Sequence, residues 1–334
     1  MWDAAFIIMC VVVFLALAFD FINGFHDTAN AIATSVSTRA LSPRMAIVLA
    51  SSMNFVGALT FTGVAKMIGG GIADPAELDH GVQIVIAALI GAIVWNLVTW
   101  WFGIPSSSSH ALIGSLAGAV IGAAGLAGIN GGGFTSIVQG LIFSPLIAFT
   151  LGYGLMSLLK VIFANRSPHQ VNRGFRITQI FTASFQAFSH GTNDAQKAMG
   201  IITFALVAAE VQDTLDVPLW VKISAATAMA LGTSVGGWKI IKTMGTKIFK
   251  IEPINGFAAD AASAAVILTA TLTHFPVSTT HVITSSILGV GSAKRFSSVR
   301  WSLAGRIVIA WVVTIPVTMV MAALIFMLIE SIWL

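Results

Sequence analysis

The chain has 334 residues, of which 57% are hydrophobic and only 9% are charged, and its mean hydropathy is +0.92. Soluble globular proteins carry about 25% charged residues, so this composition excludes a water-soluble protein. The formal net charge of +4 is spread over short clusters, which excludes a nucleic-acid-binding surface. The sequence therefore predicts an all-α, polytopic membrane protein with little mass outside the bilayer.

Ten hydrophobic runs follow one another along the chain. A transmembrane helix needs about 20 mostly apolar residues, so we expect about ten crossings. The runs cover approximately residues 5–37, 45–68, 82–103, 106–127, 136–162, 177–209, 219–243, 255–275, 277–293 and 303–333.

Four of these runs differ from ordinary crossings in their length or polarity. Residues 5–37 and 177–209 would each span about 50 Å at a rise of about 1.5 Å per residue, whereas the hydrocarbon core is about 30 Å thick. Both contain polar, glycine-bearing stretches, so we expect each to be a broken helix. Residues 106–127 and 277–293 follow a proline or a hydroxyl-rich stretch, and we expect re-entrant half-helices there.

The charged residues between the runs are sorted by sign. Cytoplasmic loops of membrane proteins carry an excess of Lys and Arg, so the pattern predicts ten crossings with both termini outside the cell. The basic clusters lie at residues 39–44, 160–176, 239–250 and 294–300, and the acidic clusters at 74–79 and 210–216.

The chain also contains an internal repeat. Residues 24–31 (GFHDTANA) align with 191–198 (GTNDAQKA), and residues 105–110 (PSSSSH) align with 276–281 (PVSTTH). Five crossings per repeat is an odd number, so the second repeat has inverted topology, as in many secondary transporters. We expect a first repeat at 1–163, a short cytoplasmic linker at 164–176 and a second repeat at 177–334.

Acidic residues inside the apolar runs are candidates for coupling transport to an ion. A charged side chain within the bilayer normally faces a cavity, an ion or a partner. Asp27 and Asp194 are equivalent in the repeat, and their carboxylates could hold a cation or take up a proton. A structural ion pair between Asp194 and Lys197 is the alternative. Asp20 and Asp260 also lie in apolar runs, and a role for them stays open, with a solvent-facing position as the alternative for Asp260.

The two hydroxyl-rich stretches are candidates for binding an anion. Each precedes an apolar run, and helix N-termini present unpaired N–H donors and a partial positive charge. Two such ends, one per repeat, could hold a tetrahedral oxyanion between them. The alternative is that these hydroxyls only cap the helices. The residues concerned are Ser107, Ser108 and Ser109 in the first repeat and Ser278, Thr279 and Thr280 in the second.

Other motifs point away from enzymatic activity. Ser109 precedes His110, but adjacent side chains on a helix point apart. Residues 232–236 (GTSVG) match a hydrolase nucleophile pattern that requires a strand-to-helix turn, whereas here they lie in an apolar run where small residues allow close packing. The sequence also lacks a nucleotide-binding loop. The roles of four histidines near the motifs stay open: His26, His110, His190 and His281.

The duplicated motifs, Asn23–Ala31 and His190–Lys197, resemble the signature of the inorganic phosphate transporter (PiT) family, and most of all its bacterial low-affinity branch. The resemblance implies symport of inorganic phosphate with H⁺ or Na⁺, in some members as a metal–phosphate complex, and no further cofactor. It places the coupling ion at Asp27 and Asp194, which would be metal ligands if the ion is Na⁺. It places the substrate at Asn30, Ser107, Ser108, Ser109, Asn193, Ser278, Thr279 and Thr280, and we add the neighbouring Gln196 and Lys197 as candidate substrate-binding residues.

The resemblance and the topology together predict a phosphate importer of a bacterial plasma membrane that is not an enzyme. Phe25-His26 and Gln196-Lys197 depart from the family's commoner signature, so both coupling ions stay in consideration. A sulfate permease of the same superfamily and a passive anion channel are the alternative functions. The apolar outer helices are compatible with a homodimer.

Overall fold

The computed structural model describes residues 4–78 and 80–333, and in these residues it contains helices and no strand. The acidic residue Asp79 lies outside the described residues. The helix α7 begins within the predicted 164–176 linker, which is therefore partly helical. The helices are α1 (Ala4–Ser37), α2 (Pro43–Ala58), α3 (Gly63–Gly71), α4 (Gly81–Phe102), α5 (Ser108–Ala124), α6 (Gly131–Ile162), α7 (Pro168–Ala208), α8 (Leu219–Val235), α9 (Trp238–Lys242), α10 (Pro253–Leu272), α11 (Thr279–Arg295) and α12 (Trp301–Trp333), with the short turns η1 (Leu126–Gly128), η2 (Thr243–Lys247) and η3 (Phe296–Ser298).

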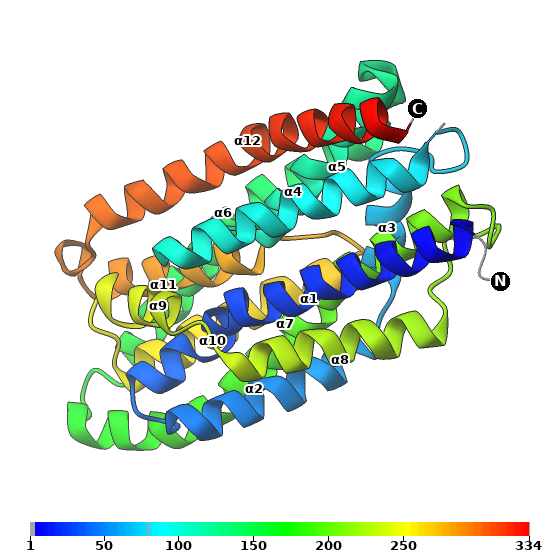
Figure 1. Cartoon of the computed structure of the whole chain (residues 1–334). Coiled ribbons are helices and arrows are strands. Elements are labelled where there is room, and N and C mark those ends of the chain that lie inside the picture. Colours follow the sequence, from blue (N-terminus) through cyan, green and yellow to red (C-terminus); the bar gives the residue numbers. More distant parts are fainter. Residues whose placement is uncertain (1–3, 79, 334) are drawn as a thin grey trace.

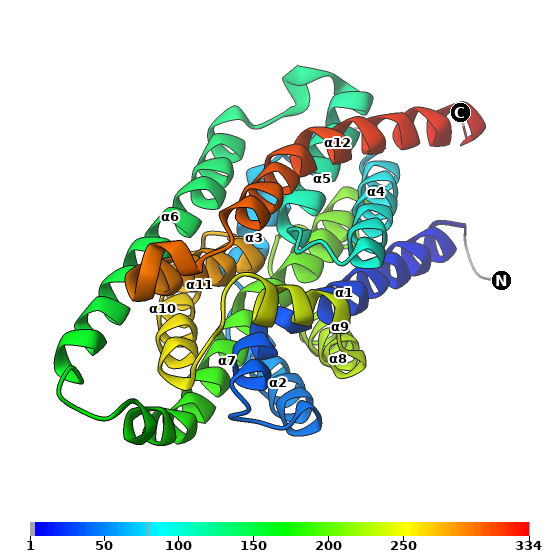
Figure 2. The ribbon, with the colours of Figure 1, turned by 90° about the vertical axis from the view of Figure 1, so that its left-hand side faces the viewer.

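Several helices have the length and apolarity of membrane spans. Within the described residues these are α1, α4, α6, α10 and α12, and the pair α2 and α3, bent by 70°, would form one more span. The helices α6 and α12 lie on the outside of the bundle (Figure 2) and expose large apolar side chains such as Leu146 and Val312. Such a surface suits lipid rather than water, so the chain is a multi-pass membrane protein.

The two long runs form continuous helices, so the expectation that α1 and α7 would be broken is wrong. Their signature glycines allow close packing instead of interrupting the helix. A β-carbon at Gly24 would collide with the carbonyl oxygen of Met229 on α8, and one at Gly191 with that of Asn54 on α2. The bend occurs in the run at 45–68, between α2 and α3.

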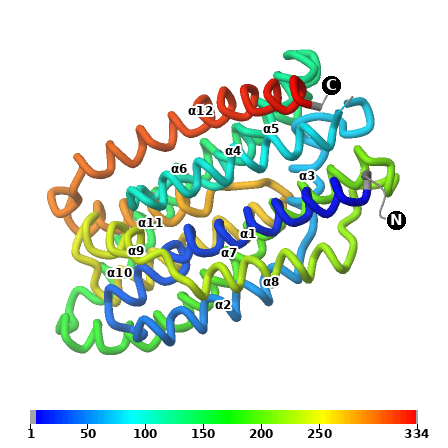
Figure 3. The backbone as a smooth tube through the Cα atoms, viewed as in Figure 1, coloured from blue at the N-terminus to red at the C-terminus, as the bar shows by residue number. Residues whose placement is uncertain are grey.

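The predicted half-helices correspond to α5 and α11, which have 17 residues each. Figure 3 shows the segment before α11 turning back from the end of α10. The helix α5 packs against α12, and α11 packs against α6. A β-carbon at Gly118 would collide with the carbonyl oxygen of Met319, and one at Gly289 with that of Phe149. Each half-helix is thus held by the last helix of the other repeat.

The two ends of the bundle differ in charge, as the sequence predicts. Both termini lie at one end (Figure 1), together with the loops that carry the acidic clusters. There the backbone N–H of Asn130 donates to the carbonyl oxygen of Ile72 at 2.8 Å. The loops with the basic clusters lie at the opposite end, where Lys160 Nζ donates to the carbonyl oxygen of Ala293 at 2.8 Å.

Candidate functional site

The two signature aspartates lie close together although 167 residues separate them. Asp27 is on α1 and Asp194 is on α7, and both side chains are buried together with His190. One ligand atom from each of these three residues lies within 4.8 Å of the other two. Two carboxylates and an imidazole are groups that can hold a cation or a proton. The repeat therefore places its two copies at one site, as the sequence predicts.

The N-termini of both half-helices face these aspartates. Ser108 Oγ, at the start of α5, donates to Asp27 Oδ2 at 3.2 Å. At the start of α11, Thr280 Oγ1 donates to Asp27 Oδ1 at 3.2 Å and Thr279 Oγ1 donates to Asp194 Oδ2 at 3.1 Å. Hydroxyl donors from both repeats are thus bound to the carboxylates.

Asn30 and Lys197 complete the site from equivalent positions in the repeat. Asn30 Nδ2 donates to the hydroxyl oxygens of Thr279 at 3.2 Å and Thr280 at 2.9 Å. Lys197 Nζ donates to Asp194 Oδ1 at 2.6 Å. The signature cluster, as we use the term below, comprises Asp27, Asn30, Ser108, His190, Asp194, Lys197, Thr279 and Thr280.

Two of the predicted substrate-binding residues serve as helix caps. Ser107 Oγ accepts from the backbone N–H of His110 at 3.1 Å, and Ser278 Oγ accepts from that of His281 at 3.2 Å. The alternative of simple capping therefore describes these two serines in this structure. Their bonds fix the direction in which the other hydroxyls of α5 and α11 point.

Three other predicted residues make bonds outside the signature cluster. Ser109 Oγ donates to the carbonyl oxygen of Val277 at 2.8 Å, and Asn193 Oδ1 accepts from the N–H of Val277 at 3.3 Å. Both therefore fasten the extended segment that leads into α11. Gln196 Oε1 accepts from the backbone N–H of Ala65 on α3 at 3.1 Å. These three residues therefore hold the surrounding backbone in position, and these hydrogen bonds do not reach the carboxylates of the two signature aspartates.

Two histidines of undecided role touch the aspartates. His26 Nδ1 lies 2.6 Å from Asp27 Oδ1, and His26 Nε2 lies 3.1 Å from Thr99 Oγ1. His190 Nε2 lies 3.3 Å from Asp194 Oδ2. Because residues four apart share a helix face, the spacing of His190 and Asp194 is a signal in the sequence that predicts this contact. Thr99, on α4, carries no such signal.

The two remaining acidic residues of the apolar runs are also fully buried. Neither carboxylate oxygen of Asp20 has a hydrogen-bond partner among the described residues. Asp260 Oδ1, on α10, accepts from Thr34 Oγ1 on α1 at 2.7 Å. A solvent-facing position for Asp260 is therefore wrong, because this side chain joins two helices in the interior.

The other two histidines pack against each other beside the half-helix N-termini. The ring centroids of His110 and His281 are 4.3 Å apart, and the ring of His281 stacks on Trp311 at 3.9 Å. Trp311 Nε1 in turn donates to the carbonyl oxygen of Pro105 at 3.2 Å. Since the hydroxyl of Ser109 donates to a backbone carbonyl, it does not pair with His110 as a nucleophile would.

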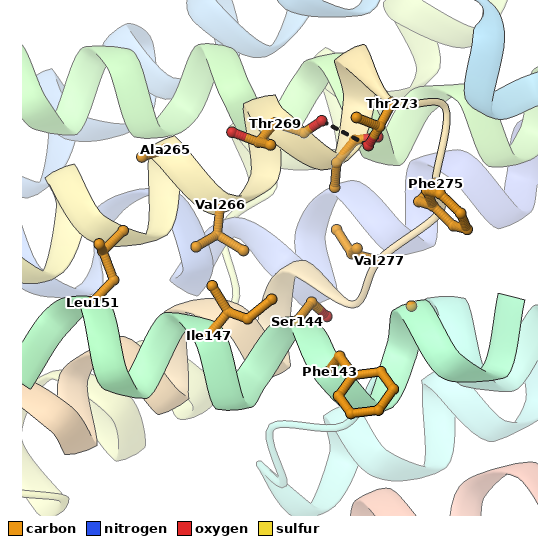
Figure 4. A pocket seen from close by; sticks show the side chains of 12 residues that line it. Phe143, Ser144, Ile147, Leu151, Ala265, Val266, Thr269, Thr273, Phe275 and Val277 are labelled. Carbon is orange, nitrogen blue, oxygen red and sulfur yellow. Dashed lines mark hydrogen bonds between the residues drawn. The ribbon is translucent and has the colours of Figure 1, made fainter. Parts of the chain in front are cut away.

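A groove between α6 and α10 lies away from the signature cluster (Figure 4). Its volume is about 290 Å³, and none of its lining residues is charged. Phe143 and Ile147 in its wall are more than half exposed, and the Thr273 hydroxyl is bound to the carbonyl oxygen of Thr269. Because its lining is mostly apolar and carries no charged group, this groove suits a lipid chain better than an oxyanion.

The profile of the phosphate transporter family matches the chain twice, at residues 23–170 and 163–322. The chain belongs to this family. A protein of Bacillus subtilis (strain 168) described as a probable low-affinity inorganic phosphate transporter is 57% identical over 332 residues, which are 99% of this chain and 100% of that protein. A Rhizobium meliloti (strain 1021) protein with the same description is 46% identical, and the match covers 96% of each chain.

A solved structure of similar fold supports the same assignment. It is described as "The sodium-dependent phosphate transporter", and it aligns with a TM-score of 0.87 and 25% identity over 97% of this chain and 99% of that chain. The resemblance drawn from the two signature copies is confirmed. The chain is a member of a transporter family and not an enzyme.

Proposed function

We propose that the chain is a secondary transporter that imports inorganic phosphate together with a coupling cation, either H⁺ or Na⁺. The observation that carries this proposal is that hydroxyls from both half-helices donate to the two signature aspartates in one buried cluster. The descriptions of the relatives support phosphate as the substrate. The sodium dependence named for the solved relative supports coupling to a cation.

The half-helix N-termini supply the groups that an oxyanion needs. Ser108, Thr279 and Thr280 are the first residues of α5 and α11, where backbone N–H groups lack partners within the helix. The helix dipole adds a partial positive charge at each of the two ends. Hydroxyl and N–H donors from the two repeats would therefore converge on a phosphate placed between them.

Competition for the hydroxyl protons couples the anion to a cation. Each hydroxyl has a single proton to donate, so a bond from Thr280 to phosphate must replace its bond to Asp27. Two like unit charges about 4 Å apart also repel by about 4 kcal/mol at an effective dielectric constant of about 20. A proton or cation on Asp27 removes both obstacles, because it neutralises the carboxylate and weakens it as an acceptor. Phosphate and cation then bind more tightly together than either does alone.

The repeat provides a route for moving the substrate between the two sides of the membrane. In inverted-repeat transporters, the equivalent halves exchange conformations around a site near the bilayer midplane. Ten crossings, with the segments 104–124 and 273–295 counted as one each, leave both termini at one end of the bundle, as in Figure 1. The charge difference between the ends supports an outside location for the termini in a bacterial plasma membrane.

Phosphate uptake into proteoliposomes tests this proposal. The purified protein is reconstituted, and radiolabelled phosphate uptake is measured under a sodium gradient, a proton gradient or neither, with and without excess sulfate. We expect uptake that one of the gradients drives and that sulfate leaves unchanged. Uptake that ignores both gradients would identify a passive channel, and strong inhibition by sulfate would identify a sulfate permease. Repeating the assay with and without Mg²⁺ shows whether the phosphate travels as a metal complex.

A further inference from the structure

The two halves of the signature cluster differ in charge. Asn30 and Lys197 each stand three residues after the aspartate of their own signature copy. Asn30 is neutral and binds two hydroxyls of α11. Lys197 places its ammonium 2.6 Å from Asp194 Oδ1. Asp194 therefore has a positive charge of the chain beside it, whereas the equivalent position beside Asp27 is uncharged.

The ammonium of Lys197 is confined to this place. Its side chain has no exposed surface and is among the largest fully buried side chains of the protein. A buried ammonium is tolerated only when it is paired, and the carboxylate of Asp194 is the partner in hydrogen-bond contact with it. The positive charge of Lys197 is thus a permanent part of the site, unlike a free cation, which is released after transport.

Both oxygens of Asp194 are engaged by donors. Lys197 binds Oδ1, while Thr279 and Asn23 donate to Oδ2 at 3.1 Å and 3.5 Å. A free cation approaching Asp194 would be repelled by the ammonium. The partners of Asp27 are hydroxyls and His26, which can donate to Asp27 as a neutral imidazole.

We propose that Lys197 is a tethered coupling charge, which takes the place of a free cation at Asp194 throughout the transport cycle. A free cation then binds at Asp27 only. If position 197 were Asn, as position 30 is, each aspartate would need its own free cation, so Lys197 lowers the number of free cations carried with each phosphate by one. This inference rests on the proposed function, because it concerns the stoichiometry of that same transport.

The substitution Lys197→Asn tests the inference by making the second half like the first. Wild type and variant are reconstituted, and the cation-to-phosphate stoichiometry is obtained from the membrane voltage at which net phosphate flux vanishes in known gradients. We expect the variant to move one more cation per phosphate, with a steeper dependence of uptake on cation concentration. An unchanged stoichiometry with a raised KM for phosphate would overturn the inference, because it would make Lys197 a phosphate ligand.

Lys66→Asn is the matched control, because it removes a lysine from α3 that pairs with Asp216 at the surface. It should leave the stoichiometry at the wild-type value. A change in this control equal to that of Lys197→Asn would contradict a specific role for Lys197.

A binding measurement decides the matter if Lys197→Asn does not transport. The melting temperature of each purified protein is measured in NaCl against choline chloride, and across a pH series. We expect the cation that drives wild-type uptake to raise the melting temperature of Lys197→Asn more than that of wild type. The double variant Lys197→Asn/Asp194→Asn should lose this extra response. Equal responses of Lys197→Asn and wild type would refute the tethered charge. If the wild-type protein takes up no phosphate at all, the proposed function fails. The melting-temperature comparison still decides the role of Lys197 in that case, and the cation used for it is the one, Na⁺ or H⁺, that shifts the melting temperature more.

Discussion

The hydroxyl of Thr280 illustrates how a single residue can link two ligands. It donates to Asp27 at 3.2 Å and accepts from Asn30 at 2.9 Å, so both its donor and one acceptor position are in use. A phosphate oxygen can accept a hydrogen bond from this hydroxyl only if the bond to Asp27 is broken. This competition for one hydroxyl proton is the reason that we propose the carboxylate of Asp27 as the site of the coupling ion.

The substitution Asp27→Asn tests this link. The amide keeps the size of the side chain but can neither hold a cation by charge nor take up a proton, so the coupling ion loses its site. We expect uptake driven by either gradient to fall to the level of protein-free liposomes, while the melting temperature changes by only a few degrees. Asp213→Asn, in an exposed loop, is the control and should transport like wild type. Wild-type uptake by Asp27→Asn would refute the role of Asp27.

The sequence predicts the aspartates and several of their partners. The repeat alone pairs Asp27 with Asp194, and the proline-led hydroxyl stretches locate Thr279 and Thr280. It could not show that Ser107 and Ser278 act as caps while Ser108 turns to Asp27, because neighbouring hydroxyls look alike until the first helical turn is placed. Contacts from α4, such as Thr99 with His26, depend on tertiary packing and have no sequence signal.

At the scale of the helices, close crossings at glycine hold the half-helices in place. The crossing of α5 with α12 at Gly118 and that of α11 with α6 at Gly289 are equivalents in the repeat. The N-termini of α5 and α11 can face each other because both half-helices are fixed at these crossings. The signature glycines of α1 and α7 act in the same way against α8 and α2.

The substitution Gly118→Ala tests the importance of this packing. The added methyl group would collide with the backbone of Met319 on α12, and a backbone neighbour cannot move aside as a flexible side chain can. Overpacking of this kind costs about 1–3 kcal/mol, so we expect a melting temperature several degrees below that of wild type. Gly154→Ala on α6 is the matched control, since a β-carbon there meets no atom within 4 Å. An equal melting temperature for the two variants would contradict the account.

The same glycines explain why the prediction of broken helices failed. Glycine in a long hydrophobic run commonly marks an interruption, but it also marks a place where another helix approaches closely. In α1 and α7 the polar signature side chains find partners on neighbouring helices, so the helices continue through them. The length of a hydrophobic run could not distinguish a broken helix from a continuous one, because a long continuous helix also fits the membrane when it is tilted or extends beyond it.

At the scale of the whole molecule, the two repeats interlock rather than lying side by side. Each half-helix packs against the final helix of the other repeat, and α1 and α7 pack against α8 and α2. The signature cluster, which we propose as the substrate site, therefore lies between halves that share their packing surfaces. The sequence predicted the repeat and the separation of charged loops, but the exchange of packing partners is a tertiary property.

Cysteine labelling in whole cells tests the orientation of this assembly. In a Cys10→Ser background, a single cysteine is introduced at Asp213 in an acidic loop or at Ser298 in a basic loop, both of which are exposed. We expect a membrane-impermeant maleimide to label the cysteine at 213 in intact cells. The cysteine at 298 should react only after permeabilisation. The reverse pattern would place the termini in the cytoplasm.

We expect phosphate and the coupling cation to bind cooperatively at the signature cluster. The most direct measurement is the Kd of phosphate for the purified protein, obtained by calorimetry at several Na⁺ concentrations and pH values and corrected for the ionisation of phosphate itself. We expect the coupling cation to lower the Kd of phosphate, and phosphate to lower the Kd of the cation by the same factor. A phosphate Kd that is indifferent to both Na⁺ and pH would contradict it.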